Sequence, residues 1–273
     1  MASAEDLVEH ALYVTRVDGL DHYEPRYSRL YFGNEFCQCL IPGPRELDIA
    51  VGFAESKGMG FTLLTPYVTN DGMTGVQKLL DRLSERSLES EVVFNDWGVF
   101  RLIKSYPGLR PVLGRLLNKM KRGPRLMHFL GFTPPETKEY FRSCSLETPH
   151  YQRFLQQSGI RRAELDNVFQ GIGLDLHDSA LRASIYIPYA FVTTTRFCQA
   201  SACEDAGMED EVGILECKKE CRKYTFTLHH PAMPVPLFSK GNTKFIRNDE
   251  VPENLLSHGI DRIVFEPEIP MCE

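Results

Sequence analysis

The sequence lacks any apolar run near the roughly 18 residues that a membrane-spanning helix requires. Its first residues, MASAEDLVEH, lack the basic stretch followed by an apolar stretch that marks a secretory signal. We therefore expect a cytoplasmic protein without a membrane span. Positive charge is not in excess either, because 31 Lys and Arg stand against 37 Asp and Glu. This balance excludes binding to DNA or anionic membranes through bulk charge, while a local basic patch can still bind a small anion or RNA.

Motifs that would announce a common enzyme class are also missing. The sequence contains no G-x-S-x-G elbow, no H-E-x-x-H helix and no P-loop, so no proteolytic nucleophile or water-activating zinc site can be read from local sequence. No G-x-G-x-x-G follows the first predicted strand, which counts against a dinucleotide-binding open sheet. The C-x₂-C pairs that structural zinc sites favour are absent as well.

The sequence does contain a regular alternation of strands and helices. Segments 11–17, 29–33, 60–65, 91–94 and 111–114 are strand-like, and amphipathic helical segments separate most of them. This alternation predicts parallel βαβ units. Further strand-like segments follow in the second half of the chain, at 161–166, 182–195, 223–228, 236–239, 243–246 and 261–265.

The fold class predicted from this pattern is α/β, as a TIM-like barrel that is either complete or distorted. The length of 273 residues suits one such barrel, which typically needs roughly 250. We expect one domain over 1–273, with a long excursion at about 119–160 and a cysteine-rich loop at 197–223. Residues 18–28, DGLDHYEPRYS, stand where the first barrel helix is expected, which indicates a shortened first unit.

Eight cysteines in a reducing compartment indicate metal or cluster ligation rather than disulfides. The stretch 197–221 and the end of the strand at 29–33 carry six of them, namely Cys37, Cys39, Cys198, Cys203, Cys217 and Cys221. In a parallel barrel all strand C-termini share one face, so these distant segments can meet there. An iron–sulfur cluster is the favoured ligand, and zinc remains the alternative. Cys144 and Cys272 are interpreted as ordinary buried thiols.

Polar residues after two other strands are candidates for substrate chemistry. The segment RLLNKMKRGPR (115–125) follows the strand at 111–114, so its cations, among them Arg115, Lys119 and Arg122, can bind a carboxylate or a phosphate at the same rim. A solvated loop is the alternative. Asp96 directly follows another strand and is either a catalytic group or the N-cap of the next helix.

Several segments, in this order over about residues 29–265, resemble the family of collagenase-like peptidases of unknown catalytic type, and in particular its UbiV-like small members from oxygen-independent ubiquinone biosynthesis. The segments that carry the resemblance are YFGNEFC (31–37), NDWGV (95–99), VLGRLLN (112–118), AFVTTTRFC (190–198), ECKKEC (216–221) and LFSKGNTKFI (237–246). Asn118, at the end of VLGRLLN, thereby becomes a further candidate for substrate binding or catalysis.

The resemblance implies a [4Fe–4S] cluster held by one early and three late cysteines, which correspond by position to Cys37, Cys198, Cys217 and Cys221. Cys39 and Cys203 are the alternates, since each lies near one end of the site. The implied function is oxygen-independent hydroxylation of a quinone precursor or a nucleobase, with a homologous partner subunit and a small anionic or aromatic substrate. Two alternatives remain open: a true peptidase, and a non-catalytic subunit with a structural cluster or zinc.

Overall fold

The computed structural model describes residues 7–86, 89–176, 179–205 and 216–271. Its main element is a closed barrel of eight parallel strands, in the order β1-β12-β7-β6-β5-β4-β3-β2. The strands are β1 (Glu9–Val14), β2 (Arg29–Gly33), β3 (Gly60–Leu64), β4 (Ser90–Phe94), β5 (Leu109–Leu113), β6 (Arg162–Asp166), β7 (Arg182–Ile187) and β12 (Ile260–Phe265). The predicted TIM-like α/β barrel is therefore confirmed.

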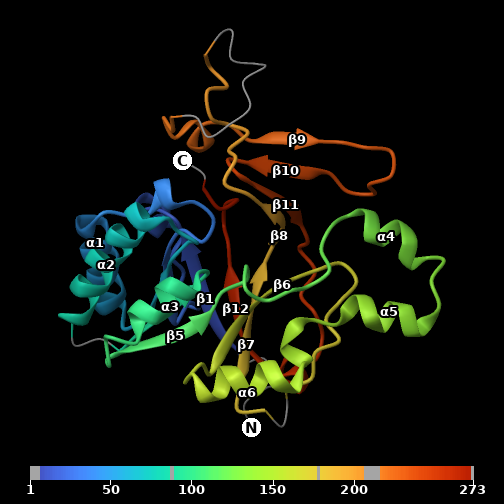
Figure 1. Cartoon of the computed structure of the whole chain (residues 1–273), viewed down its shortest axis with the longest axis horizontal. Coiled ribbons are helices and arrows are strands. Elements are labelled where there is room, and N and C mark those ends of the chain that lie inside the picture. The colour runs from blue at the N-terminus through green and yellow to red at the C-terminus, as the bar shows by residue number, and fades with distance from the viewer. Residues whose placement is uncertain (1–6, 87–88, 177–178, 206–215, 272–273) are drawn as a thin grey trace.

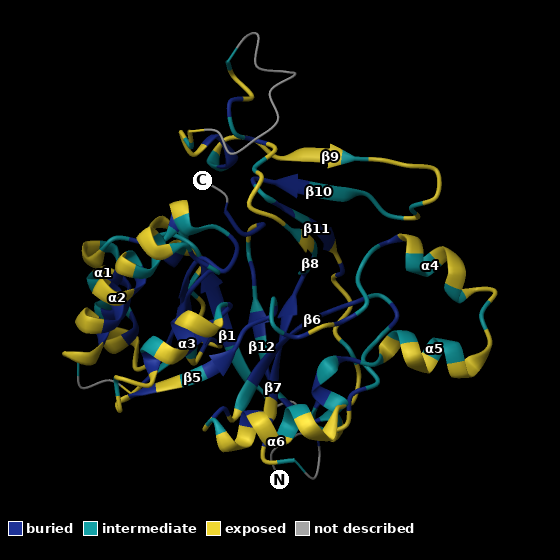
Figure 2. Ribbon diagram, viewed as in Figure 1, coloured by how far each residue is buried: buried dark blue, intermediate teal, exposed yellow. Residues whose placement is uncertain are grey.

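Helices α1 (Pro44–Lys57), α2 (Asn70–Ser84) and α3 (Trp97–Ile103) follow β2, β3 and β4 and cover the barrel from outside (Figure 1). Their apolar stripes face the strands and their polar faces are exposed, as Figure 2 shows. The short 3₁₀-helix Asp18–His22 stands where the first barrel helix was expected. No helix in the described ranges is both long and apolar enough to cross a membrane.

The excursion after β5 carries α4 (Arg125–Leu130), α5 (Pro135–Arg142) and α6 (Pro149–Gln157) before the chain enters β6. Helix α6 packs back against the barrel through the buried side chain of Leu155. Helices α4 and α5 have no buried residue, and they lie to one side of the barrel (Figure 2).

A second sheet lies across the end of the barrel at which β2 and β7 finish (Figure 1). It is antiparallel, in the order β8-β11-β10-β9, and consists of β8 (Tyr189–Thr194), β9 (Phe226–Leu228), β10 (Leu237–Lys240) and β11 (Thr243–Arg247). The strand expected over 182–195 is two strands, because the chain leaves the barrel at Pro188. The sequence pattern thus located these strands but did not show that they leave the barrel.

Three apolar cores hold the layers together. The largest lies between the barrel and its helices, and a smaller one fills the barrel interior with side chains such as Tyr31 and Tyr186. The third lies between the barrel end and the second sheet, where Phe36, Phe191 and Phe245 meet. Because Cys221 belongs to this third core, the cysteine-rich loop is anchored to both sheets.

A thiol-lined cavity and an adjoining basic cavity

Cys37 is positioned by the turn that follows β2. Gly33 has a φ of +126°, and a Cβ there would lie 2.4 Å from the carbonyl oxygen of Leu64, so the strand can leave the barrel here only with glycine. Asn34 then closes the turn, because its Oδ1 accepts hydrogen bonds from the backbone N–H groups of Phe36 at 2.9 Å and Cys37 at 2.8 Å. The early cysteine therefore lies on a rigid turn at the barrel rim.

The late cysteines are held by Glu220, a carboxylate that is only 4% exposed. One of its oxygens accepts from the backbone N–H of Ala202 at 2.9 Å, and the other accepts from the backbone N–H of Lys218 at 3.1 Å. These two bonds tie the turn after Cys198 to the segment that begins at residue 216. The part of the predicted 197–223 loop between them, 206–215, lies outside the described residues.

Five thiols line one small cavity between the two sheets. They belong to Cys37, Cys39, Cys198, Cys217 and Cys221. The cavity has a volume of about 70 Å³, several times the roughly 10–15 Å³ that a single water molecule requires. Its remaining wall consists of Arg196, Ser201, Gly241, Asn242 and Met271. The structure thus brings the early and late cysteines together, and it supplies no described carboxylate or imidazole to the same cavity.

Burial raises the pKa of four thiols in this cavity, those of Cys37, Cys198, Cys217 and Cys221. The pKa of Cys37 rises to about 12, chiefly because burial removes the thiolate from water. Repulsion from the neighbouring thiolates of Cys39, Cys221 and Cys217 raises the pKa further. The pKa of Cys221 also rises to about 12, through desolvation and the nearby Cys198 and Cys217. Converging thiolates are therefore unfavourable here unless a cationic centre binds to them, since metal coordination reverses this preference.

The thiols surround the cavity without converging on one point. Among the described residues, no three His, Cys, Asp or Glu side chains are arranged to hold a single metal ion. A tetrahedral zinc site requires sulfurs within about 2.3 Å of one centre. The described residues therefore form no ready-made mononuclear site.

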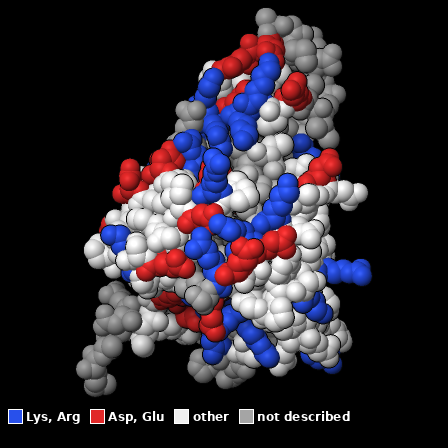
Figure 3. Space-filling view, turned by 90° about the vertical axis from the view of Figure 1, so that its left-hand side faces the viewer, with Lys and Arg blue, Asp and Glu red and all other residues white. Residues whose placement is uncertain are grey.

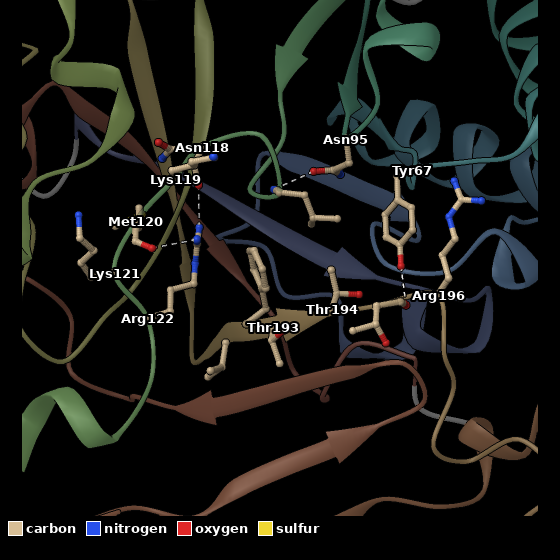
Figure 4. A pocket seen from close by; sticks show the side chains of 14 residues that line it. Tyr67, Asn95, Asn118, Lys119, Met120, Lys121, Arg122, Thr193, Thr194 and Arg196 are labelled. Atoms are coloured by element: carbon tan, nitrogen blue, oxygen red, sulfur yellow. Dashed lines mark hydrogen bonds between the residues drawn. The ribbon is translucent and has the colours of Figure 1, made fainter. Parts of the chain in front are cut away.

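A second, larger cavity of about 720 Å³ opens beside the thiol cavity, and Figure 4 shows it from close by. Lys121 and Arg122 lie on one side of it, and Tyr67 and Arg196 lie on the opposite side. The full lining is Tyr67, Asn95, Leu116, Asn118, Lys119, Met120, Lys121, Arg122, Phe191, Val192, Thr193, Thr194, Thr195 and Arg196. Four of these side chains are cationic and none is acidic, so the cavity favours an anionic ligand.

The cationic side chains of this second cavity differ in whether their N–H donors already bond to other protein groups. Arg122 donates to Asp166 at 2.8 Å and to the backbone carbonyls of Arg115 and Asn118, and its guanidinium lies 4.1 Å from the Phe191 ring centroid. Lys119, in contrast, is exposed and has no ion-pair partner among the described residues. Arg122 therefore shapes the cavity, while Lys119 retains free donors.

A single layer of residues separates the two cavities. Tyr67 lines the large cavity, and its hydroxyl donates to the carbonyl of Thr195 at 2.6 Å, as Figure 4 shows. Asn242 lines the thiol cavity and donates to the same Tyr67 hydroxyl at 3.1 Å. Arg196 lines both cavities. A ligand in the large cavity would therefore lie next to whatever the thiols bind.

No family model matches the chain, and no curated protein matches it. One similar solved structure is that of the U32 peptidase Mk0906, with 13% identity over 99% of this chain and 97% of that chain and a TM-score of 0.49. Another is SuiB of Streptococcus suis bound to S-adenosylmethionine, with 12% identity over 66% and 38% of the two chains and a TM-score of 0.30. Neither likeness carries an argument about the site.

Most of the residues predicted to form the site lie at the two cavities. Asn118, Lys119 and Arg122 line the large cavity. The side chain of Asn118 is buried, and its Nδ2 has no hydrogen-bond partner among the described residues, although the Cys144 thiol lies nearby. Cys203 does not line the thiol cavity, so Cys39 is the alternate cysteine that the geometry retains.

Two predicted residues lie elsewhere. Asp96 is the N-cap of α3: its side chain accepts from the backbone N–H of Gly98 at 2.6 Å and from that of Val68 at 3.3 Å. Arg115 is completely buried below the large cavity rather than in its lining. It donates to three carboxylates, those of Glu35, Asp166 and Glu266.

Sequence reasoning missed the wall residues Tyr67, Arg196 and Asn242. Arg196 occurs in the quoted segment 190–198 and Asn242 in the quoted segment 237–246, but neither segment indicated a cavity-facing side chain. For Arg196 the sequence signal was its position two residues before Cys198, and for Asn242 it was the hairpin turn expected there. Their meaning required the second sheet, which brings residues 195–198 and 241–242 against the barrel rim.

Proposed function

We propose that the five-thiol cavity binds a [4Fe–4S] cluster and that the adjoining basic cavity binds the substrate on which the cluster-dependent chemistry takes place. The observation that carries the proposal is the gathering of five cysteines, up to 184 positions apart in the chain, around one cavity with no other described acidic or imidazole ligand. Thiolate-only ligation is the donor set that such clusters prefer. When bound, the cluster supplies electron transfer at the edge of the basic cavity.

The proposed ligands are Cys37, Cys198, Cys217 and Cys221, with Cys39 as the alternate. Burial supports this choice, because Cys221 is buried and the other three are half-buried, whereas Cys39 is exposed. The structure also provides a compensating charge, because the buried Lys240 lies near Cys221 and donates to the carbonyl of Arg222 at 3.3 Å. A buried cation at this place offsets part of the negative charge of four thiolates.

Two observations favour a cluster over zinc. The sequence lacks the C-x₂-C pairs that structural zinc sites favour, and the cavity has room for more than one atom. A cluster is an assembly of several iron and sulfide atoms, so its ligands surround a wider core.

The basic cavity supports a small anionic substrate with an apolar or aromatic body. Its volume of about 720 Å³ lies within the range of ligand-binding cavities, roughly 300–1,000 Å³. Leu116, Met120 and Val192 supply apolar wall, while Lys119 supplies free positive charge. Asn118 lines the same cavity, and its carboxamide is a neutral hydrogen-bonding group beside these cations.

The reaction we propose is oxygen-independent hydroxylation of a quinone precursor or a nucleobase, by a UbiV-like protein with a homologous partner subunit. Support for this step comes from the resemblance of the cysteine-bearing segments. Figure 3 bears on the nucleobase alternative: on the face shown, Lys and Arg are interspersed with Asp and Glu. Lys and Arg run along the upper half of that face with Asp and Glu beside them, so the nucleobase alternative is kept.

A peptidase of the collagenase-like type is the rival function. The described lining of the large cavity contains no Ser, Cys, His, Asp or Glu, so it offers neither a Ser–His or Cys–His pair nor a carboxylate pair. The other rival is a non-catalytic subunit in which a cluster or zinc ties the second sheet to the barrel. Each rival predicts a different effect of cavity substitutions than the proposed function does, so one experiment distinguishes all three.

The deciding experiment is purification without air, followed by measurement of iron, acid-labile sulfide, zinc and the visible spectrum. We expect about four iron and four sulfide per chain and a broad absorbance in the visible spectrum. Stoichiometric zinc in an iron-free protein would contradict the proposal. Peptide cleavage that survives Cys217→Ser would support the peptidase. Loss of folding in Cys217→Ser, with no effect of Asn118→Ala on turnover, would support the non-catalytic subunit.

A further inference from the structure

Arg196 occupies the junction of the two cavities, and its side chain lines both of them. It is exposed, and no carboxylate among the described residues pairs with it. In Figure 4 its guanidinium extends beside Tyr67, across the cavity from Arg122. The two other arginines near this site, Arg115 and Arg122, already donate to carboxylates and backbone carbonyls. Arg196 is therefore the arginine whose donors are free for a ligand.

The surroundings of Arg196 fix where a ligand group would lie. Its guanidinium carbon is 5.8 Å from the centroid of the Tyr67 ring. That ring is held in place because its hydroxyl bonds to the Thr195 carbonyl and to Asn242. The guanidinium thus projects from an anchored segment rather than from a free loop, and it faces a wall without acidic side chains.

We infer that Arg196 binds the oxyanion of an aromatic ligand at this junction, with the ring of the ligand in the basic cavity. The inference rests on the proposed function and specifies its substrate class: a ring with a carboxylate or a phosphate, oriented with its charged end toward the thiol cavity. A guanidinium offers planar paired donors that match either oxyanion. The ring would pack against Tyr67, Leu116 and Val192, which line the same cavity. Arg196 is in this view a substrate-positioning residue beside the cluster.

The test uses the anaerobically purified full chain and three probes: 4-hydroxybenzoate, phenyl phosphate and the uncharged 4-hydroxybenzamide. Binding is measured by calorimetry and by the electron paramagnetic resonance spectrum of the reduced protein. We expect the charged probes to bind and the amide to bind at least about tenfold more weakly, because a charge-assisted bidentate contact is lost. Whichever charged probe binds more tightly identifies the oxyanion as carboxylate or phosphate.

Arg196→Ala should weaken the charged probes about tenfold or more, and Arg196→Lys should restore part of the affinity. Arg101→Ala is the matched control, because Arg101 is an exposed arginine on α3 outside both cavities. Iron content is measured in every sample, so that loss of the cluster is distinguished from loss of the ligand contact. If Arg196→Ala lowers the iron content, the affinity of Arg196→Lys for the charged probes, measured at normal iron content, decides whether Arg196 binds the ligand.

Unchanged affinity in Arg196→Ala, or equal binding of amide and carboxylate, overturns the inference. A charged probe that binds without altering the spectrum of the reduced protein overturns the position beside the cluster. A colourless, iron-free wild type contradicts the proposed function instead, and the calorimetric comparison then still decides whether Arg196 binds an oxyanion.

Discussion

Asn242 donates a hydrogen bond to the backbone carbonyl of Phe36 at 2.7 Å, across 206 positions of the chain. The same amide nitrogen donates to the carbonyl of Thr195 at 2.6 Å. Phe36 precedes Cys37, and Thr195 lies three residues before Cys198, so one carboxamide joins the early and the late cysteine segments. The β10–β11 hairpin thereby closes the thiol cavity, at a turn in which Gly241 has a φ of +58° and approaches Cys221.

Asn242→Ala should therefore weaken cluster retention without unfolding the barrel. Each lost hydrogen bond is worth about 1 kcal/mol, and the two N–H groups of this amide serve the carbonyls of Phe36 and Thr195, so we expect iron to be removed by a chelator at least about tenfold faster. Asn70→Ala, at an exposed position on α2, is the control and should match the wild type. Equal rates of iron loss in the two variants would show that the hairpin contact does not hold the cavity.

Serine substitutions should separate cluster ligands from bystanders. Cys37→Ser, Cys198→Ser, Cys217→Ser and Cys221→Ser should each lose most of the iron, because a thiolate ligand is removed. Cys203→Ser is the matched control and should keep full iron, since Cys203 lies outside the cavity lining. Iron and acid-labile sulfide per chain are the measurement. Loss of iron in Cys203→Ser would contradict the assignment.

Cys39→Ser decides the role of the fifth thiol. Because Cys39 is exposed and four other thiols line the cavity, we expect this variant to keep its iron. Comparison with Cys37→Ser under identical purification provides the measurement. Iron lost in Cys39→Ser but kept in Cys37→Ser would exchange the two roles.

Arg115→Met should lower the free energy of unfolding by about 3–5 kcal/mol, because three buried carboxylates lose their shared partner. Arg110→Met is the control: its ion pair with Glu89 is exposed, and such pairs contribute about 0–1 kcal/mol. Urea unfolding at matched iron content measures both. A stable Arg115→Met variant with weakened ligand binding would instead support the substrate role first predicted for Arg115.

Glu164 should make the protein less stable as pH rises toward neutrality. Burial raises its pKa to about 7, although Arg262 and Arg162 lower it. The native carboxyl therefore keeps its proton while the unfolded one ionises near pH 4.5, so stability falls between about pH 4.5 and 7 and levels off above. The shift corresponds to roughly 3 kcal/mol.

Glu164→Gln removes this titration, so its unfolding free energy should fall less between pH 5 and 8 than that of the wild type. Glu89→Gln, at an exposed carboxylate, should retain the wild-type slope. Urea unfolding at several pH values measures the difference. Identical slopes in wild type and Glu164→Gln would show that the buried carboxyl is ionised throughout.

The amino-acid sequence by itself determined the barrel, because its strands and helices follow from the local spacing of apolar residues. The buried stripe of α2, with Val76, Leu79, Leu80 and Leu83, can be read from spacing alone. The sequence also placed Cys37 at a strand end, and strand ends share one face in any parallel barrel. The N-cap was one of the two roles predicted for Asp96, beside a catalytic one, and the structure shows Asp96 as the N-cap of α3.

Only the tertiary structure decided which cysteines share a cavity and what faces the substrate. Strands 223–228 and 243–246 look alike in sequence whether they close a barrel or form a second sheet, since partner choice depends on long-range pairing. The burial of Arg115 likewise depends on carboxylates from three distant segments, so a cation expected at the surface lies inside the molecule. Arg196 and Asn242 became visible as wall residues because the second sheet folds back onto the barrel rim.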